Sequence, residues 1–248
     1  DDLRSLTRRS MPQVVINCAA YTAVDGAESD RDRAYLVNAI GAKNAAIAAA
    51  EVSAEFVHVS TDYVFDGEKS GEYDEYDATR PISVYGHSKL AGEHAVHDVG
   101  GKVYVVRTQW LYGEGGKCFP DTILKLATER PELRIVNDQI GKPTYTGDVA
   151  RQVKSLVESR QFGVYHAAAL GTVTWFEFAQ ALFEREAVQG CRLIPITTAE
   201  YPTAARRPRN SALRNLNLSL TIGDSMPPWS QGLDEFLRRR RGAKDKAG

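Results

Sequence analysis

Short apolar runs alternate along most of the chain with longer segments in which apolar residues recur every three to four positions. Many residues of the short runs are β-branched, which is the pattern of strands buried on both faces of a sheet. We predict strands over residues 13–18, 56–60, 103–108, 133–137, 143–146 and 164–168, and helices over residues 31–50, 85–98, 119–129 and 147–159. This order predicts an α/β fold in which helices cover both faces of a parallel sheet.

The pattern changes after about residue 172, where an amphipathic helix and a Pro- and Arg-rich stretch replace the alternation. We therefore predict one sheet domain formed by residues 1–112 and 144–172. A smaller α+β lobe, formed by residues 113–143 and 173–248, should cover ligands at the carboxyl ends of the strands. The tail that begins with the arginines at 238–241 is predicted to be a frayed, solvated end.

Charge balance and cysteine usage exclude several classes of protein. The 248 residues contain 31 Lys and Arg against 32 Asp and Glu, a net charge of −1 that does not suit neutralisation of nucleic-acid phosphates. No apolar run reaches the ~18 residues of a membrane span, and no signal-peptide pattern opens the chain. Three widely spaced cysteines favour neither a disulfide framework nor a zinc site. We expect a cytoplasmic protein without nucleic-acid or membrane partners.

Tyr85 and Lys89 form a Tyr-x-x-x-Lys pair within a predicted helix. Residues four apart lie on one face of a helix, one turn from each other. A nearby ammonium favours the phenolate, so Lys89 should lower the pKa of Tyr85 toward the neutral range and make the phenol a usable acid or base. A contact on the helix surface is the alternative explanation of this spacing taken alone.

The residues that end the apolar run FVHV strengthen the catalytic interpretation. Ser60, Thr61 and Asp62 lie at the carboxyl end of a predicted strand, where open parallel sheets place ligand contacts. A hydroxyl there can hydrogen-bond a substrate carbonyl or alcohol. Because Thr61 and Tyr85 belong to consecutive strand–loop–helix units, we expect both side chains at one crevice.

Two other strand ends carry residues suited to ligand contacts. Ala19 and Ala20 follow the first predicted strand, and their small side chains let a flat ligand approach the backbone, with tight helix–sheet packing as the alternative. Trp110 and Tyr112 follow VYVVRT and can wall a sugar or a base, with core filling as the alternative.

The histidines and glycines of the sequence give weaker evidence of a functional site. His94 and His97, beside Glu93, are predicted to lie on a solvated helix surface, and His58 is predicted to pack in the core. The sequence holds neither G-x-G-x-x-G nor G-x-x-G-x-x-G, the loop that cradles pyrophosphate after the first strand of a Rossmann fold. We expect that loop to lie upstream of Asp1.

Several longer motifs carry a resemblance to a known family. They are VVINCAAYTAVDGAE (14–28), VHVSTDYVFDG (57–67), PISVYGHSKLAGE (81–93), VVRTQWLYG (105–113), VNDQIGKPTY (136–145) and, more loosely, RRPRNSAL (206–213). Together they resemble the extended short-chain dehydrogenase/reductase superfamily and, within it, the dTDP-4-dehydrorhamnose reductase family. The resemblance implies a Rossmann-like, doubly wound parallel sheet whose N-terminal strands are missing here, with a smaller substrate-binding lobe.

The resemblance also implies a reaction and the residues that catalyse it. The family reduces the 4-keto group of dTDP-4-dehydro-6-deoxy-L-mannose with NADPH or NADH, giving dTDP-L-rhamnose. By position, Tyr85 would donate a proton to the forming alkoxide, and Lys89 would lower its pKa and bind the nicotinamide ribose. Thr61 would hydrogen-bond the sugar near its carbonyl with Asp62 beside it, and Trp110 would line the sugar pocket.

The implied cofactor contacts come from the first two strand ends and the tyrosine helix. They are Ala20, Tyr21, Thr22, Val59, Tyr85 and Lys89. The choice between NADH and NADPH is left open. Magnesium, which some family members bind through glutamates at a dimer interface, cannot be mapped onto this sequence, and a homodimer is an open possibility.

Two rival functions share the same motifs. One is a regulatory subunit that works through a partner, as the methionine adenosyltransferase β-subunit does. The other is a reductase or epimerase of a different 4-keto sugar nucleotide. A 4,6-dehydratase is disfavoured because Tyr63 stands where those enzymes carry a glutamate that performs elimination.

Overall fold

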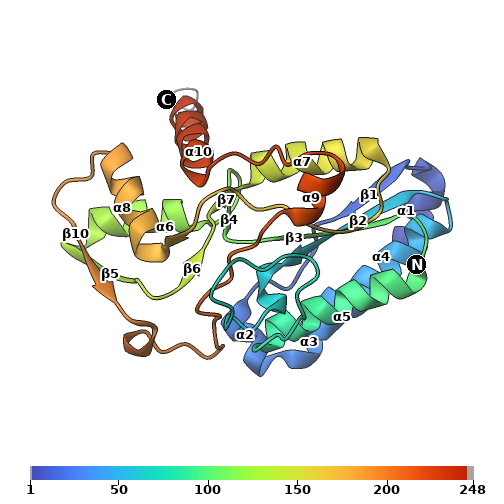
Figure 1. Cartoon of the computed structure of the whole chain (residues 1–248), viewed down its shortest axis with the longest axis horizontal. Helices are drawn as coiled ribbons and strands as arrows, with labels where there is room; N and C mark the ends of the chain where they lie inside the picture. The colour runs from blue at the N-terminus through green and yellow to red at the C-terminus, as the bar shows by residue number, and fades with distance from the viewer. Residues whose placement is uncertain (1, 245–248) are drawn as a thin grey trace.

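The computed structural model describes residues 2–244 and arranges them as two groups of elements, side by side (Figure 1). The larger group is built on a parallel sheet with the strand order β1-β2-β3-β8. Its strands span Val14–Asn17, Glu55–Thr61, Val103–Thr108 and Gly163–His166. The α/β fold with a parallel sheet predicted from the alternating pattern is confirmed.

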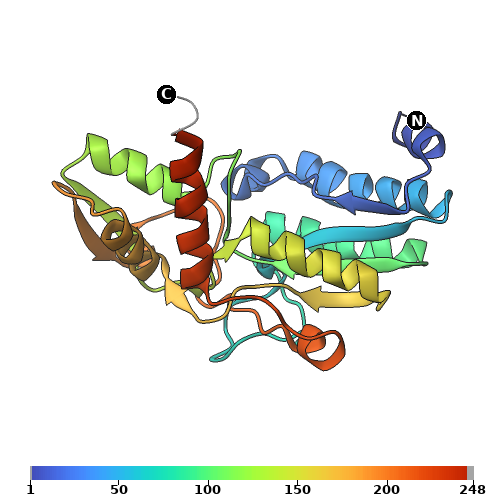
Figure 2. The same cartoon turned by 90° about the horizontal axis from the view of Figure 1, so that it is seen from above.

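Helices pack on both faces of this sheet (Figure 2). Successive strand residues point to opposite faces, so Phe56 packs against the helices of one face and Val57 against those of the other. The first face is covered by α3 (Arg31–Tyr35), the π-helix η1 (Leu36–Gly41), α4 (Ala42–Ala50) and α5 (Val84–Val99). The second face is covered by α7 (Thr146–Ser159) and α9 (Leu216–Thr221). Two further helices, α1 (Asp2–Ser10) and α2 (Val24–Ser29), pack beside α4 and α5.

The smaller group lies beyond the carboxyl ends of the large sheet. It pairs β5 (Glu132–Val136) with β10 (Arg192–Ile196) and adds α6 (Phe119–Glu129), α8 (Trp175–Arg185), the 3-10 helix η3 (Thr198–Glu200) and α10 (Trp229–Lys244). Two short pairs link the groups: β4 (Leu111–Tyr112) with β7 (Thr144–Tyr145), and β6 (Ile140–Gly141) with β9 (Val173–Thr174). We keep the predicted domain boundaries as a proposal.

The arginines at 238–241 differ from the prediction of a frayed end, because α10 continues through them. Arg240 donates to Asp121 at 2.7 Å, and Arg241 donates to Glu186 at 2.5 Å. Phe236 anchors the helix in the core of the smaller group. Basic side chains in the last turns of a helix also interact favourably with its dipole.

The helix α5 approaches its neighbours closely at two glycines. A Cβ built on Gly92 would lie 2.2 Å from the carbonyl oxygen of Asn38 in η1, and one on Gly86 would lie 2.2 Å from the carbonyl oxygen of Tyr63. Both obstacles are backbone atoms, which cannot rotate away. These glycines therefore fix how deeply α5 sits against the sheet.

Gly92→Ala should destabilise the protein by about 1–3 kcal/mol, because the added methyl overpacks a backbone contact. Urea unfolding measures this change. The matched control is Gly41→Ala, where the nearest atom would lie at an ordinary 3.4 Å, and where higher helix propensity should offset any cost. Equal destabilisation by both substitutions would contradict the packing argument.

Candidate active site

Thr61, Tyr85 and Lys89, predicted to share a crevice, lie together at the carboxyl end of β2. Lys89 donates from Nζ to the carbonyl oxygen of Val59 at 2.6 Å, and Val59 is two residues before Thr61. The Thr61 hydroxyl accepts from the N–H of Tyr63 at 3.2 Å and lies close enough to the phenol of Tyr85 to affect the pKa of that phenol. The ring of Tyr85 packs edge-on against that of Tyr63, with 5.5 Å between centroids.

Local signals at the start of α5 place Tyr85 in its first turn. Ser83 caps the helix, and its hydroxyl accepts from the backbone N–H of Gly86 at 3.1 Å. The Glu28 carboxylate accepts from the N–H of Val84 at 2.8 Å and satisfies another free donor of that turn. These contacts fix the phenol beside the end of β2.

Asp62 follows Thr61 at the start of a 3-10 helix, η2 (Asp62–Val64), and is buried. The Thr61 hydroxyl donates to Asp62 Oδ1 at 2.9 Å and accepts from the N–H of Tyr63 at 3.2 Å. The second carboxylate oxygen, Oδ2, has no hydrogen-bond partner in the described part of the chain. Burial raises the pKa of Asp62 to about 6, although the nearby hydroxyls of Ser211 and Thr61 act against the rise.

The predicted lowering of the Tyr85 pKa by Lys89 is wrong for this structure. Burial raises the pKa of Tyr85 to about 12, with hydrogen bonding to Thr61 acting against the rise and the Asp62 charge adding to it. The Lys89 ammonium donates to Val59, and its own pKa is lowered to about 8 by burial, partly offset by Glu93 and Cys18. The spacing correctly placed Tyr85 and Lys89 on one face of the helix. Burial, however, has a larger effect on the Tyr85 pKa than attraction to Lys89.

The segment after β1 lies beside α5 and is held by a residue that the sequence analysis missed. Asn38 Oδ1 accepts from the N–H of Tyr21 at 2.8 Å, while Asn38 Nδ2 donates to the carbonyl of Tyr21 at 3.2 Å and to the Ser88 hydroxyl at 2.9 Å. Asn38 belongs to the π-helical turn of the segment predicted as one α-helix over 31–50. Ala20 is half-buried next to Tyr21, and Thr22 is exposed.

A buried charge network underlies the site and was also missed. Glu93 accepts from Arg107 Nη2 at 2.7 Å and from the Ser60 hydroxyl at 2.5 Å. The Arg107 guanidinium also reaches His166 Nε2 at 3.5 Å. Positions 85, 89 and 93 recur every four residues, and this periodicity was a signal that Glu93 shares the inner face of α5.

The predictions for three other histidines are confirmed. His94 and His97 are exposed on α5, next to the buried Glu93. His58 is fully buried, and burial with the nearby Lys89 charge lowers its pKa to about 3. The imidazole of His58 is therefore neutral, and its Nδ1 lies 3.2 Å from the amide nitrogen of Asn17.

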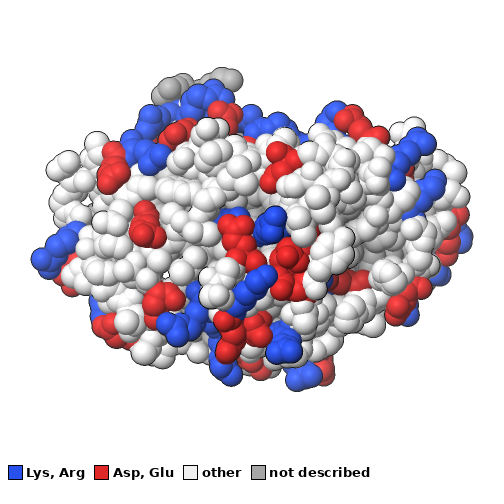
Figure 3. Space-filling model, in the orientation of Figure 1, with Lys and Arg blue, Asp and Glu red and all other residues white. Residues whose placement is uncertain are grey.

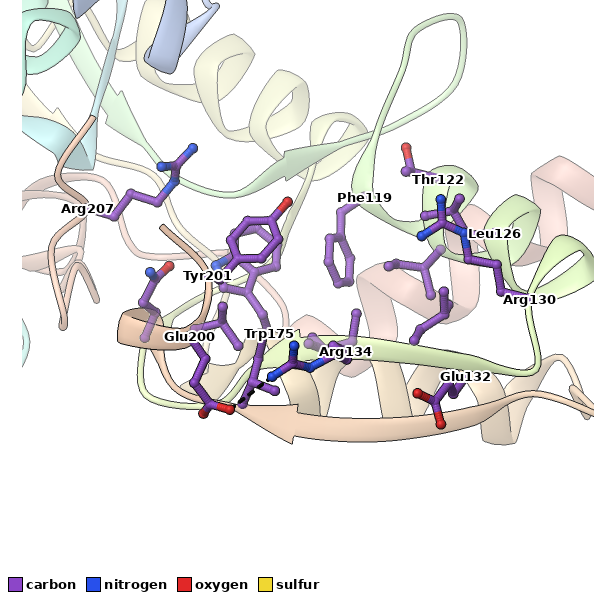
Figure 4. Close-up of a pocket in the computed structure, with 16 residues that line it drawn as sticks. Phe119, Thr122, Leu126, Arg130, Glu132, Arg134, Trp175, Glu200, Tyr201 and Arg207 are labelled. Atoms are coloured by element: carbon purple, nitrogen blue, oxygen red, sulfur yellow. Dashed lines mark hydrogen bonds and ion pairs between the residues drawn. The ribbon is translucent and has the colours of Figure 1, made fainter. Parts of the chain in front are cut away.

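A pocket of about 670 Å³ opens in the smaller group, between α6, β5 and the segment around η3 (Figure 4). Phe119, Trp175 and Tyr201 supply aromatic walls, and Arg130 and Arg207 stand at opposite ends. Elsewhere on its rim, a third arginine, Arg134, forms an ion pair of 2.9 Å with Glu200 of η3. In Figure 3, acidic and basic side chains gather along the middle of the visible face, where the two groups meet.

Trp110 packs on the wall of this pocket, and Arg207 connects the pocket to the tyrosine site. Trp110 has a positive φ of 44° and stacks on Trp175, with 3.6 Å between ring centroids. Arg207 pairs with Asp25 of α2 at 2.7 Å and lies close enough to Tyr63 to influence its ionisation. Tyr112, by contrast, is buried in the aromatic core, so the interpretation of Tyr112 as core filling is the correct one.

Residues 2–244 hold neither a candidate membrane span nor a candidate metal-ligand cluster. Within that range, no helix combines the length and apolarity needed to cross a membrane. The same residues contain no group of three or more His, Cys, Asp and Glu side chains placed to hold a metal ion.

Comparisons with known proteins agree with this arrangement. The sequence model of the protein family described as the RmlD substrate binding domain matches residues 1–241 of this chain. The chain is 40% identical over 234 residues to the spore coat polysaccharide biosynthesis protein SpsK of Bacillus subtilis, covering 94% of this chain and 82% of that protein. It is 42% identical over 233 residues to a dTDP-4-dehydrorhamnose reductase of Aggregatibacter actinomycetemcomitans, covering 90% and 79%.

A solved structure extends the agreement to three dimensions. The crystal structure of dTDP-4-dehydrorhamnose reductase from Bacillus anthracis in complex with NADP superposes with a TM-score of 0.93 at 41% identity, covering 96% of this chain and 84% of that one. The fold and the meeting of Thr61, Tyr85 and Lys89 define an extended short-chain dehydrogenase/reductase, a class of NAD(P)-dependent oxidoreductases. Within that class, the chain belongs to the dTDP-4-dehydrorhamnose reductase family.

Proposed function

We propose that this protein reduces the 4-keto group of dTDP-4-dehydro-6-deoxy-L-mannose with NADPH, giving dTDP-L-rhamnose. Relatives at about 40% identity are named dTDP-4-dehydrorhamnose reductase, and the crystal structure of one of them contains NADP. The observation that carries the proposal is the meeting of a threonine hydroxyl, a tyrosine phenol and a lysine ammonium at one strand end. The presence of all three side chains favours an enzyme over a regulatory subunit, and cofactor oxidation on adding the keto sugar nucleotide separates the two.

The residues present fit the nicotinamide half of a dinucleotide cofactor. Among the described residues Lys89 donates one hydrogen bond, to Val59, so its ammonium has donors left for the hydroxyls of a ribose. The segment Ala20–Thr22 is held beside α5 through Asn38, which bonds to Tyr21 and to Ser88. We assign this segment to the cofactor together with Val59, whose carbonyl accepts from Lys89. When bound, the reduced nicotinamide supplies the hydride, and the protein supplies orientation and a proton.

Tyr85 is the proton donor in this proposal. Because its pKa is about 12, the phenol keeps its proton throughout the neutral range and can hydrogen-bond the carbonyl oxygen of the sugar. Negative charge grows on that oxygen during reduction, and the phenol proton neutralises it. The Lys89 ammonium then stabilises the phenolate that remains. Thr61, oriented by Asp62, fixes the position of the carbonyl.

The aromatic pocket is assigned to the nucleotide part of the substrate. Its volume of about 670 Å³ suits a nucleoside diphosphate, and its aromatic walls suit stacking of a base. Arg207, at the end of the pocket nearer Tyr63 and Tyr85, can receive the pyrophosphate. Trp110, which stacks on the pocket wall, would lie along the sugar between the pocket and Tyr85.

Removing the exposed ring at the pocket rim tests this assignment. Tyr201→Ala should weaken dTDP binding about tenfold, the effect expected for one base-stacking contact. Isothermal titration with dTDP measures it. Tyr76→Ala removes another exposed tyrosine, one that does not line the pocket, and should leave the affinity unchanged. Equal losses of dTDP affinity in the two variants would mean that the nucleotide does not bind in this pocket.

The reaction itself is tested by product analysis. The purified protein, incubated with NADPH and the keto sugar nucleotide, should form a product that co-elutes with dTDP-L-rhamnose. Conversion of a different 4-keto sugar nucleotide, with the named substrate left intact, would reject the substrate assignment. Binding of the sugar nucleotide without any cofactor oxidation would favour a regulatory subunit instead.

A further inference from the structure

Lys89 is a buried cation without an ion pair. Its side chain is 2% exposed, and among the described residues no carboxylate lies within the 4.0 Å of a salt bridge from its Nζ. The Val59 carbonyl, which accepts its hydrogen bond, is an uncharged group and does not compensate the charge of Lys89. An ammonium taken out of water in this way tends to lose its proton unless a negative charge nearby compensates.

Glu93 lies one turn further along the same face of α5 and is itself 4% exposed. Its carboxylate cannot move freely, because Arg107 donates to both of its oxygens at 2.7 to 3.2 Å and Ser60 donates at 2.5 Å. Ser60 stands between Val59 and Thr61 on β2. The carboxylate is thus fixed to the strand whose end forms the site.

Several groups face Lys89 from the elements around it. His58 of β2 is neutral, and Cys18 follows β1. Tyr85 precedes Lys89 by one turn on α5 and holds its proton. Arg107 of β3 is positive but stands behind Glu93, bound to it. Glu93 supplies the largest attraction that favours the charged form of Lys89.

We propose that Glu93 is a positioning residue that keeps the Lys89 amine protonated, with Arg107 and Ser60 holding its carboxylate in place. The catalytic meaning of this pairing rests on the proposed function, because a protonated Lys89 is what stabilises the tyrosine phenolate. The attraction between the two side chains needs neither substrate nor cofactor. It can therefore be tested separately from turnover.

A double-mutant cycle on folding provides the test. The parent protein, Glu93→Gln, Lys89→Met and the double variant are unfolded with urea at about pH 7 and at about pH 10. The cost of leaving Arg107 without its carboxylate is present with and without Lys89, so it cancels in the cycle. What remains is the interaction between positions 89 and 93.

We expect a coupling of about tenfold in the unfolding equilibrium constant at about pH 7, where Lys89 is charged. At about pH 10 the coupling should fall below about twofold, because folded Lys89, with its pKa near 8, has lost its proton. If Glu93 has a purely structural role, the coupling between positions 89 and 93 should be the same at both pH values. That result, or no coupling at about pH 7, would overturn the proposal.

Should Glu93→Gln fail to fold, all four variants of the cycle are made in an Arg107→Met background, in which Glu93→Gln leaves no unpaired guanidinium. The same pH-dependent loss of coupling is expected. A positive cycle together with absent keto reduction would reject the proposed function and leave this pairing intact.

Discussion

Tyr85→Phe should lower turnover of the keto sugar nucleotide by about 10²–10⁴-fold, the usual contribution of a positioned general acid. The substitution removes one oxygen from a ring held by α5 packing and by Tyr63, so the fold should be unaffected. Since the lost proton transfer acts in the transition state, kcat should fall while dTDP affinity stays within about twofold.

Steady-state kinetics and a dTDP titration measure the two quantities on the same variant. Tyr35→Phe is the matched control, because Tyr35 is a half-buried tyrosine on α3 that the structure places outside the site. It should retain full turnover. If the Tyr85→Phe enzyme is as active as the Tyr35→Phe enzyme, a group other than Tyr85 donates the proton.

Arg107→Met should destabilise the fold by about 3–5 kcal/mol, which is typical when one partner of a buried ion pair is removed. Arg107 and Glu93 are 6% and 4% exposed, so water cannot replace the lost guanidinium. The unfolding midpoint in urea should fall accordingly. The contact of the guanidinium with His166 and its position over the Phe65 ring would be lost as well.

The double variant Arg107→Met with Glu93→Gln distinguishes charge from packing. If the uncompensated carboxylate causes most of the loss, removing it should restore a large part of the stability. A double variant as unstable as Arg107→Met alone would mean that packing of the arginine side chain dominates. A loss below about 1 kcal/mol in the single variant would contradict burial of the pair.

Elements with a clear period were predictable from the sequence. The helix over 119–129 and the strand over 103–108 have the predicted bounds, because their apolar spacing and flanking residues leave little ambiguity. The π-helical turn at 36–41 was not, since it depends on the contact that Asn38 makes with distant backbone. Tertiary contacts of this kind leave no local pattern.

The candidate site was predictable in its parts and not in its electrostatics. Spacing brought Tyr85 and Lys89 to one face, and strand order brought Thr61 beside them. The direction of the Tyr85 pKa depends on burial, which spacing along one helix does not reveal. The aromatic pocket was missed because its walls, Phe119, Trp175 and Tyr201, are separated by long stretches of sequence and meet through the packing of β5, α6 and α8.

Isotope tracing tests the central claim most directly. NADPH that carries deuterium at the transferable position of its nicotinamide is incubated with the protein and the 4-keto sugar nucleotide. We predict a product with deuterium bound to carbon 4 of the deoxysugar. A reduced product without the label, or with the label at another carbon, would contradict hydride transfer to the carbonyl beside Tyr85.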